Sequence, residues 1–278
     1  MTTRLAFAAL VVMTSIVGAA PAPTDIAWSF KSGGDDTADA AKFGFNPHGV
    51  NGAPKKWSDA YPERSDIAEL VDPTIASSGD VTWVATGVKR ATQCAGLQGT
   101  WAQCKDSAAP TINALVLYAK SGKSWHEIAI HAAVPIADKD LAKSKLKLDP
   151  VPKAIAPDAA DAAKLFETSF ADPKALAASV SARKDVTLLG SAPNEKTRGG
   201  AAVAKKLGGW QLAFTVHDGI AAGAVGNVAW VAANVDAKSS KDNKVTSYRV
   251  MAIYEKTKTW QLVAVEFSFP AEQQAPQD

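Results

Sequence analysis

Hydrophobic and polar positions alternate with a period of two in two separate parts of the chain, and the two parts have similar sequences. Residues 226–235 read GNVAWVAANV and residues 79–88 read GDVTWVATGV, so these starts lie 147 positions apart. Residues 253–270 likewise resemble residues 117–135, and their final prolines lie 135 positions apart. A repeat this long is typical of a duplicated domain, because solenoid repeats have about 20 to 50 residues.

Both parts predict antiparallel strands, because β-branched and aromatic residues are bounded there by turn-forming residues. The expected strands are residues 67–71, 81–88, 112–120 and 125–134 in the first part, and 185–190, 210–216, 228–235, 245–255 and 260–269 in the second. Asp158 and Asp172 are expected to begin two helices, and residues 200–207 predict a third. We also expect a short helix at 36–43 and a turn at His217-Asp218-Gly219. Helices beside antiparallel sheets predict the α+β class.

The expected domains follow from these elements and from changes in composition. Residues 1–19 predict a signal peptide, because Arg4 precedes an apolar run that ends in small residues. A first domain is expected at 20–135, a proline-containing linker at 136–157, a second domain at 158–270 and a disordered tail at 271–278. Export follows from the signal peptide, with periplasm and extracellular medium both open. The alternative for residues 1–19 is a buried N-terminal helix.

Both faces of the last strand in each part are largely apolar. A strict period of two places Trp260, Leu262, Ala264, Glu266 and Ser268 on one face, with Gln261, Val263, Val265, Phe267 and Phe269 on the other. The first part repeats this, with Trp125 and Ala129 opposite Ile128 and Ile130. A sheet that faces water should alternate apolar and polar residues instead. We therefore expect the two domains to cover each other as an internal pseudo-dimer.

Composition and cysteine content narrow the function classes. Hydrophobic residues make up 47% of the chain and the formal net charge is +2, with no basic arm, so a globular protein that does not bind nucleic acid is expected. After residue 19 no apolar run is long enough to span a membrane. Cys94 and Cys104 flank a predicted hairpin loop and predict a structural disulfide; a metal site or a redox pair is the alternative. No cofactor motif is present.

The second part resembles a known family over residues 158–270, and the first part resembles it over 67–135. The segments that carry the resemblance are 185–195, Arg198-Gly199, 226–232 and 260–270. They are similar to SnoaL-like proteins of the nuclear transport factor 2 and ketosteroid isomerase-like superfamily. The resemblance implies two tandem cone-shaped α+β domains, each enclosing an apolar pocket, with isomerases, cyclases and non-catalytic binding proteins among the relatives. The family's last strand often carries Trp, His, Ser and Pro; the first part lacks the Ser, and Glu266 replaces the His in the second.

The candidate site residues lie in the second part. An isomerase would need a carboxylate base in an apolar pocket, and Glu266 is the candidate, although no residue is assigned as catalytic. The candidate ligand-binding residues are Trp230, Tyr248, Trp260, Glu195 and Arg198. Glu195 and Arg198 could instead form a structural ion pair. No metal site is expected, because Glu127 and His131 alone share a strand face.

Three functions remain open from the sequence. The favoured one is a non-catalytic exported protein that binds a small apolar ligand or a protein partner in its second domain. The second is an isomerase or cyclase that acts on a hydrophobic substrate with Glu266 as base. The third is a structural interaction module of the cell envelope, which would leave a large apolar patch exposed.

Overall fold

The computed structural model of the chain describes residues 41–44, 67–90, 112–122, 124–133, 135, 148, 150–192 and 195–269. Several predictions concern residues outside these ranges: the signal peptide, the bond between Cys94 and Cys104, most of the linker and the polar tail. These stay predictions. Among the described helices, none is long and apolar enough to cross a bilayer.

The first sheet has five strands in the order β1-β5-β4-β3-β2. They are β1 (Ala41–Gly44), β2 (Ile67–Ser78), β3 (Val81–Arg90), β4 (Ile112–Ser121) and β5 (Ser124–Ala133). β2 to β5 form an antiparallel meander, and β1 joins β5 in parallel. The prediction of a helix at 36–43 is therefore wrong for residues 41–43, which belong to β1. Pairing with β5, a strand far away in sequence, outweighs a weak local preference for helix.

The second sheet has seven strands in the order β6-β9-β10-β11-β12-β7-β8. Its antiparallel meander consists of β9 (Leu212–Val225), β10 (Val228–Ser239), β11 (Val245–Lys256) and β12 (Trp260–Ser268). Three short strands, β6 (Ala154–Ile155), β7 (Thr187–Leu189) and β8 (Lys196–Arg198), extend the two edges. A 3₁₀ turn (Pro157–Ala159) leads into the helices, which are α4 (Ala160–Phe170), α5 (Pro173–Ala178) and α6 (Gly200–Gly208).

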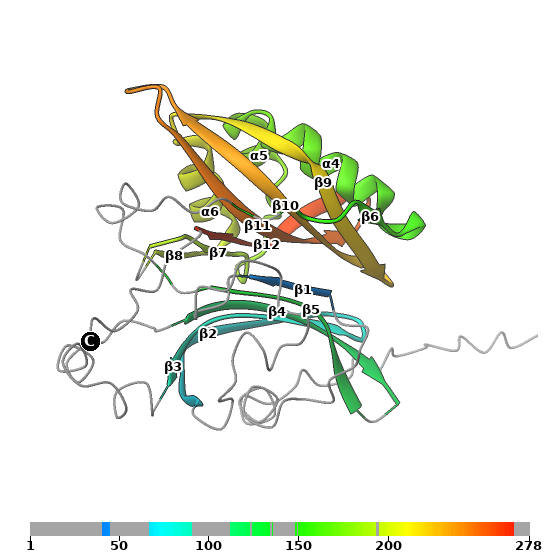
Figure 1. The fold of residues 1–278 in the computed structure, drawn as a ribbon. Coiled ribbons are helices and arrows are strands. Elements are labelled where there is room, and N and C mark those ends of the chain that lie inside the picture. The colour runs from blue at the N-terminus through cyan, green and yellow to red at the C-terminus, as the bar shows by residue number, and fades with distance from the viewer. Residues whose placement is uncertain are drawn as a thin grey trace, which may run out of the picture.

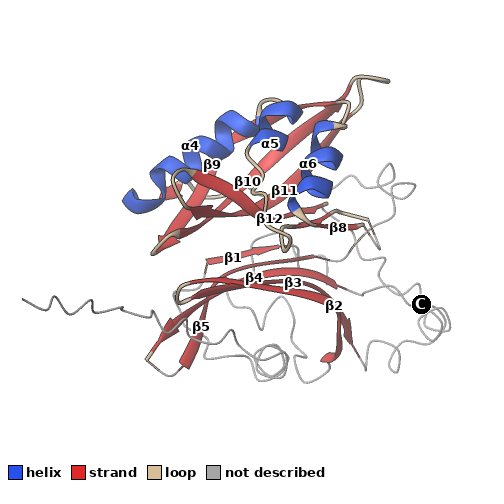
Figure 2. Cartoon of the chain, turned by 180° about the vertical axis from the view of Figure 1, so that it is seen from behind, coloured by secondary structure: helices blue, strands red, loops and turns tan. Residues whose placement is uncertain are grey.

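The described part of the molecule has three layers, which confirms the α+β class. The helices α4, α5 and α6 cover one face of the second sheet, and the first sheet lies against the other face (Figures 1 and 2). Side chains of both sheets form one apolar cluster between them, with Trp83, Leu115 and Leu117 from the first sheet and Met251 and Ile253 from the second. The second sheet is thus covered on both faces, as its apolar sequence requires.

A bulge at the same place in both last strands changes the expected faces. Ile128 in β5 and Val263 in β12 are each an extra residue opposite the neighbouring strand. The extra residue reverses the alternation beyond it. Trp260 therefore packs against the cluster beneath the helices, whereas Glu266 faces the first sheet. The prediction that both share one face is wrong for this reason.

Strand β9 runs through the segment that was expected to turn. Val216 pairs with Val235 and Ile220 with Ala233, so the three residues 217–219 lie opposite Asn234 alone, as a bulge. Gly219 is required there, because a Cβ atom would lie 2.0 Å from the Val151 carbonyl oxygen.

The two predicted helix caps have different outcomes. Asp172 caps α5, where its Oδ1 accepts a hydrogen bond of 3.1 Å from the Lys174 N–H. Asp158 makes no such bond, because it lies inside the 3₁₀ turn and the residue before α4 is Ala159.

Candidate functional site

The aromatic residues predicted to bind a ligand lie on opposite faces of the second sheet. Tyr248 and Trp260 are half-buried against the cluster beneath the helices. Trp230 packs on the other face, against the cluster between the sheets. Since a sheet separates them, these three side chains cannot line one pocket.

Glu195 and Arg198 lie in two separate ion pairs. The Glu195 carboxylate lies 2.9 Å from Lys206 Nζ, and Arg198 Nη2 lies 2.9 Å from Asp72 Oδ1. The predicted ion pair between Glu195 and Arg198 is therefore wrong. Arg198 instead links the second sheet to β2 of the first, a partner that lies 126 positions away in sequence.

The space between the helices and the second sheet is filled by the protein's own aromatic rings. Phe166 and Phe170 stack with their ring centroids 4.1 Å apart, and the Phe267 ring lies 6.0 Å from Phe170 and 5.2 Å from Trp210. Phe166 and Phe170 are fully buried. The apolar interior that the family resemblance implies is present, but its own side chains occupy it.

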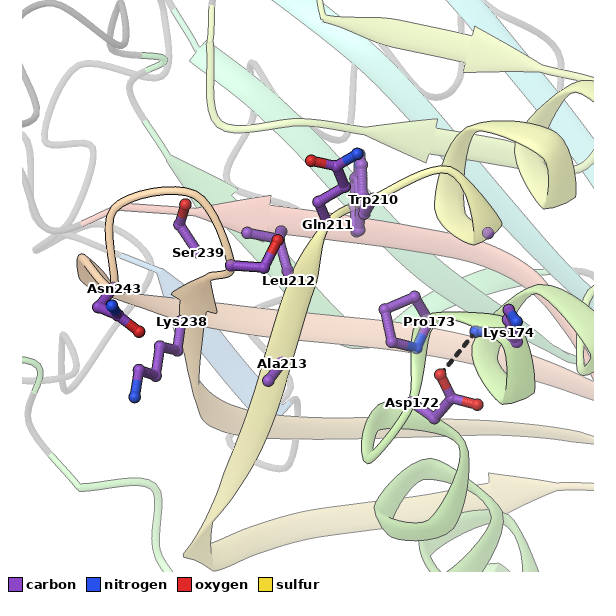
Figure 3. A pocket seen from close by; sticks show the side chains of 12 residues that line it. Asp172, Pro173, Lys174, Trp210, Gln211, Leu212, Ala213, Lys238, Ser239 and Asn243 are labelled. Atoms are coloured by element: carbon purple, nitrogen blue, oxygen red, sulfur yellow. Dashed lines mark hydrogen bonds between the residues drawn. The ribbon is translucent and has the colours of Figure 1, made fainter.

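A groove opens at one end of this packed interior, which we call the α5 groove (Figure 3). Its volume is about 460 Å³. It lies between the start of α5, the start of β9 and the β10–β11 hairpin, and its lining residues are Asp172, Pro173, Lys174, Gly208, Trp210, Gln211, Leu212, Ala213, Lys238, Ser239, Ser240 and Asn243. None of these described lining residues is a His, Cys, Tyr or Glu. Of the side chains that commonly act as general bases, this wall holds only Asp172, which caps α5, and the exposed lysines Lys174 and Lys238.

Glu266 is sealed between the two sheets. Its side chain is fully buried, and neither carboxylate oxygen has a hydrogen-bond partner among the described residues. Burial raises the pKa of Glu266 well above its usual value, and the Leu115 backbone N–H, which approaches without full hydrogen-bond geometry, opposes this rise. Glu266 does not line the α5 groove. A base in that position would have no route to a substrate.

His131 also lies between the two sheets and makes a contact that the sequence did not reveal. Its Nε2 lies 2.7 Å from Ser268 Oγ, across the interface between the sheets. Burial, and after it the positive charge of Arg249, lowers the pKa of His131 to about 3. The ring is therefore neutral near pH 7. One signal was present in the sequence: at the offset of 135, His131 and Glu266 occupy equivalent positions of the last strands.

A second histidine lies on the bulge of β9. His217 Nε2 lies 3.1 Å from Asp236 Oδ2, and Ser247 Oγ donates a bond of 2.5 Å to the other oxygen of that carboxylate. A serine nucleophile needs the imidazole between the hydroxyl and the carboxylate. Here the Asp236 carboxylate lies between the Ser247 hydroxyl and the His217 imidazole, so these three residues do not form a catalytic triad. The described residues contain no cluster of three or more metal-binding side chains.

No family model matches the sequence, and no curated protein matches it. Solved structures are similar over part of the chain. A nuclear transport factor 2-like superfamily protein from Salmonella enterica is 18% identical, covers 42% of this chain and 90% of its own, and has a TM-score of 0.33.

Two further structures are similar to the same extent. A nuclear transport factor 2-like protein of unknown function from Pseudomonas putida is 13% identical, with 43% of this chain and 93% of its own covered and a TM-score of 0.34. A nuclear transport factor 2-like protein with a cystatin-like fold from Novosphingobium aromaticivorans is 14% identical, with 43% and 86% covered and a TM-score of 0.35. Likenesses this distant say nothing of a ligand or a reaction.

Proposed function

We propose that this chain is an exported, non-catalytic binding protein built from a duplicated domain. Its ligand site is the α5 groove, and its ligand is a small molecule with an apolar body and a negative group. One observation carries the proposal: the interior beneath the helices is packed with aromatic rings, while an open groove with an apolar wall remains at its end.

The groove's wall defines the ligand class. Pro173, Trp210 and Leu212 supply apolar surface, and Lys174 and Lys238 are exposed cations that line the same groove. Neither lysine side chain has an ion-pair partner among the described residues. A volume of about 460 Å³ suits a small molecule, since such sites have about 300 to 1,000 Å³.

The enzyme alternative loses its base, because Glu266 lies on the opposite face of the second sheet from this groove. Duplication is supported by the shared meander, by the bulges at Ile128 and Val263, and by the hairpin glycines Gly79 and Gly226, which have φ angles of 58° and 60°. Export rests on the sequence alone.

Titration with anilinonaphthalene sulfonate, an aromatic anion, tests the groove by fluorescence. Lys238→Glu should weaken binding at least about tenfold, because it replaces attraction by repulsion at the groove. Lys258→Glu is the matched control, since Lys258 is exposed in the β11–β12 turn and lines none of the described grooves. Equal weakening by both variants would show that the probe binds elsewhere. Native mass spectrometry of protein from its own host would then identify the natural ligand.

A further inference from the structure

A second groove lies where the two sheets meet, and we call it the junction groove. It has a volume of about 450 Å³ and is lined by Pro73, Thr74 and Ile75 of β2, by Arg183, Lys184 and Asp185 before β7, and by Arg198 of β8. Its seven lining residues thus include three cations and one carboxylate. The groove therefore favours a negatively charged ligand.

The one carboxylate in this lining is already held. Arg183 donates two hydrogen bonds to Asp185, of 2.8 and 2.7 Å, and a third of 2.9 Å to Glu255. Its guanidinium also lies over the Trp83 ring, 5.1 Å from the centroid. Arg183 lowers the pKa of Asp185, so that carboxylate stays ionised and paired. These contacts fix Arg183 as a structural part of the groove.

The other two cations have donors to spare. Lys184 is exposed and has no ion-pair partner among the described residues. Arg198 uses only Nη2, which bonds to Asp72 and to the Pro73 carbonyl, so its Nε and Nη1 make no bond to the described part of the chain. The Asp72 side chain is 63% exposed, and exposed ion pairs contribute little stability. An incoming anion can therefore compete for Arg198.

Thr74 brings a buried hydroxyl to the wall of the groove. The residue is only 6% exposed and lines the groove, and its Oγ1 has no hydrogen-bond partner among the described residues. A buried hydroxyl without a partner is costly, whereas an oxygen of a bound anion would satisfy it.

We propose that the junction groove binds a phosphoryl group, either as free phosphate or on a small phosphorylated molecule. Arg198 and Lys184 would hold the charged oxygens, with the Thr74 hydroxyl as a further donor, because guanidinium, ammonium and hydroxyl donors together suit a tetrahedral oxyanion. Pro73 and Ile75 leave an apolar wall for an organic substituent. Since Thr74 belongs to β2 of the first sheet, Arg198 to β8 of the second and Lys184 to the segment before β7, a bound ligand bridges the sheets and stabilises their packing.

Isothermal titration calorimetry of the full chain tests the proposal with inorganic phosphate and with phenyl phosphate, against sodium chloride at equal ionic strength. We expect saturable binding of a phosphate compound and a higher melting temperature than in chloride. Tighter binding of phenyl phosphate would identify a phosphorylated molecule as the ligand, and tighter binding of inorganic phosphate would identify the free ion. Equal behaviour in phosphate, phenyl phosphate and chloride would overturn the proposal.

Two variants and a control locate the site. Arg198→Gln should weaken phosphate binding about tenfold or more, and Lys184→Gln about fivefold. Lys164→Gln is the control, because Lys164 is exposed on α4 and lines neither groove. If Arg198→Gln fails to fold, Lys184→Gln decides, since that side chain holds no described ion pair. Equal effects of Lys184→Gln and Lys164→Gln would refute the site, and the outcome is independent of the α5 groove.

Discussion

The buried carboxyl group of Glu266 makes a specific prediction about stability and pH. In the folded protein its pKa is raised well above the ordinary value of 4.5, because burial disfavours the charged form. The folded state therefore holds a proton that the unfolded chain releases above pH 4.5, and stability falls as pH rises from there toward the folded pKa. Holding the group neutral at pH 7 costs up to roughly 3 kcal/mol, at about 1.4 kcal/mol per pH unit.

Glu266→Gln removes this ionisation while keeping the shape of the protonated acid. We expect similar free energies of unfolding for both proteins at pH 4, and an advantage for the variant that grows to about 1–3 kcal/mol at pH 7. The assay is urea unfolding followed by tryptophan fluorescence and circular dichroism at pH 4, 5.5, 7 and 8.

The control for this series is Glu167→Gln, an exposed carboxylate on α4. Its stability curve should run parallel to that of the unmodified protein at all pH values. The reasoning is refuted if the Glu266→Gln curve is also parallel, because a carboxyl group that ionises normally in the folded state contributes no such slope. If the Glu266→Gln curve is lowered at every pH but still gains on that of the unmodified protein as pH rises, the lowering would mean only that the new amide lacks a partner.

Three further outcomes are expected. Because the pKa of His131 is lowered to about 3, the folded state binds fewer protons than the unfolded state below pH 6.5, and stability is lost as pH falls. His131→Gln should reduce this loss of stability in unfolding measured from pH 7 to pH 4. Gly219→Ala should lower the melting temperature by several degrees, because its Cβ meets the Val151 carbonyl oxygen. Gly79→Ala separates this clash from backbone strain, because Gly79 has a positive φ of 58° but its Cβ would meet no atom within 4 Å. Arg183→Lys should lower the free energy of unfolding by about 1–3 kcal/mol, because lysine cannot keep both the paired hydrogen bonds and the stacking on Trp83. Arg198→Lys, at an exposed ion pair, should lower it by less than about 1 kcal/mol.

The strands of both meanders were predictable because their signals are local. Alternating apolar residues end at turn residues such as Gly79 and Gly226, so the positions of β3 and β10 follow from the sequence. The cap at Asp172 was also predictable, since the carboxylate and the N–H that it accepts from lie two residues apart. What each strand face contacts was harder to predict.

Side-chain direction depends on features that the local sequence does not encode. The bulge at Val263 depends on how β12 pairs with β11, which the local sequence does not show. A strict period of two therefore placed Trp260 and Glu266 on the same face, which is wrong. The segment at His217 has the composition of a turn, but pairing of β9 with β10 on both sides keeps it in the strand. The partner of Arg198 lies in the other half of the chain, where spacing gives no guidance.

The shared layer between the sheets has a consequence for how this protein can be made. Trp83 and Leu117 on one side and Met251 and Ile253 on the other are each at most 1% exposed only while both halves are together. If the chain were divided within the linker and expressed as two polypeptides, each would expose an apolar sheet face to water. We expect each to precipitate when synthesised alone, and the pair to remain in solution and co-purify when synthesised in one cell.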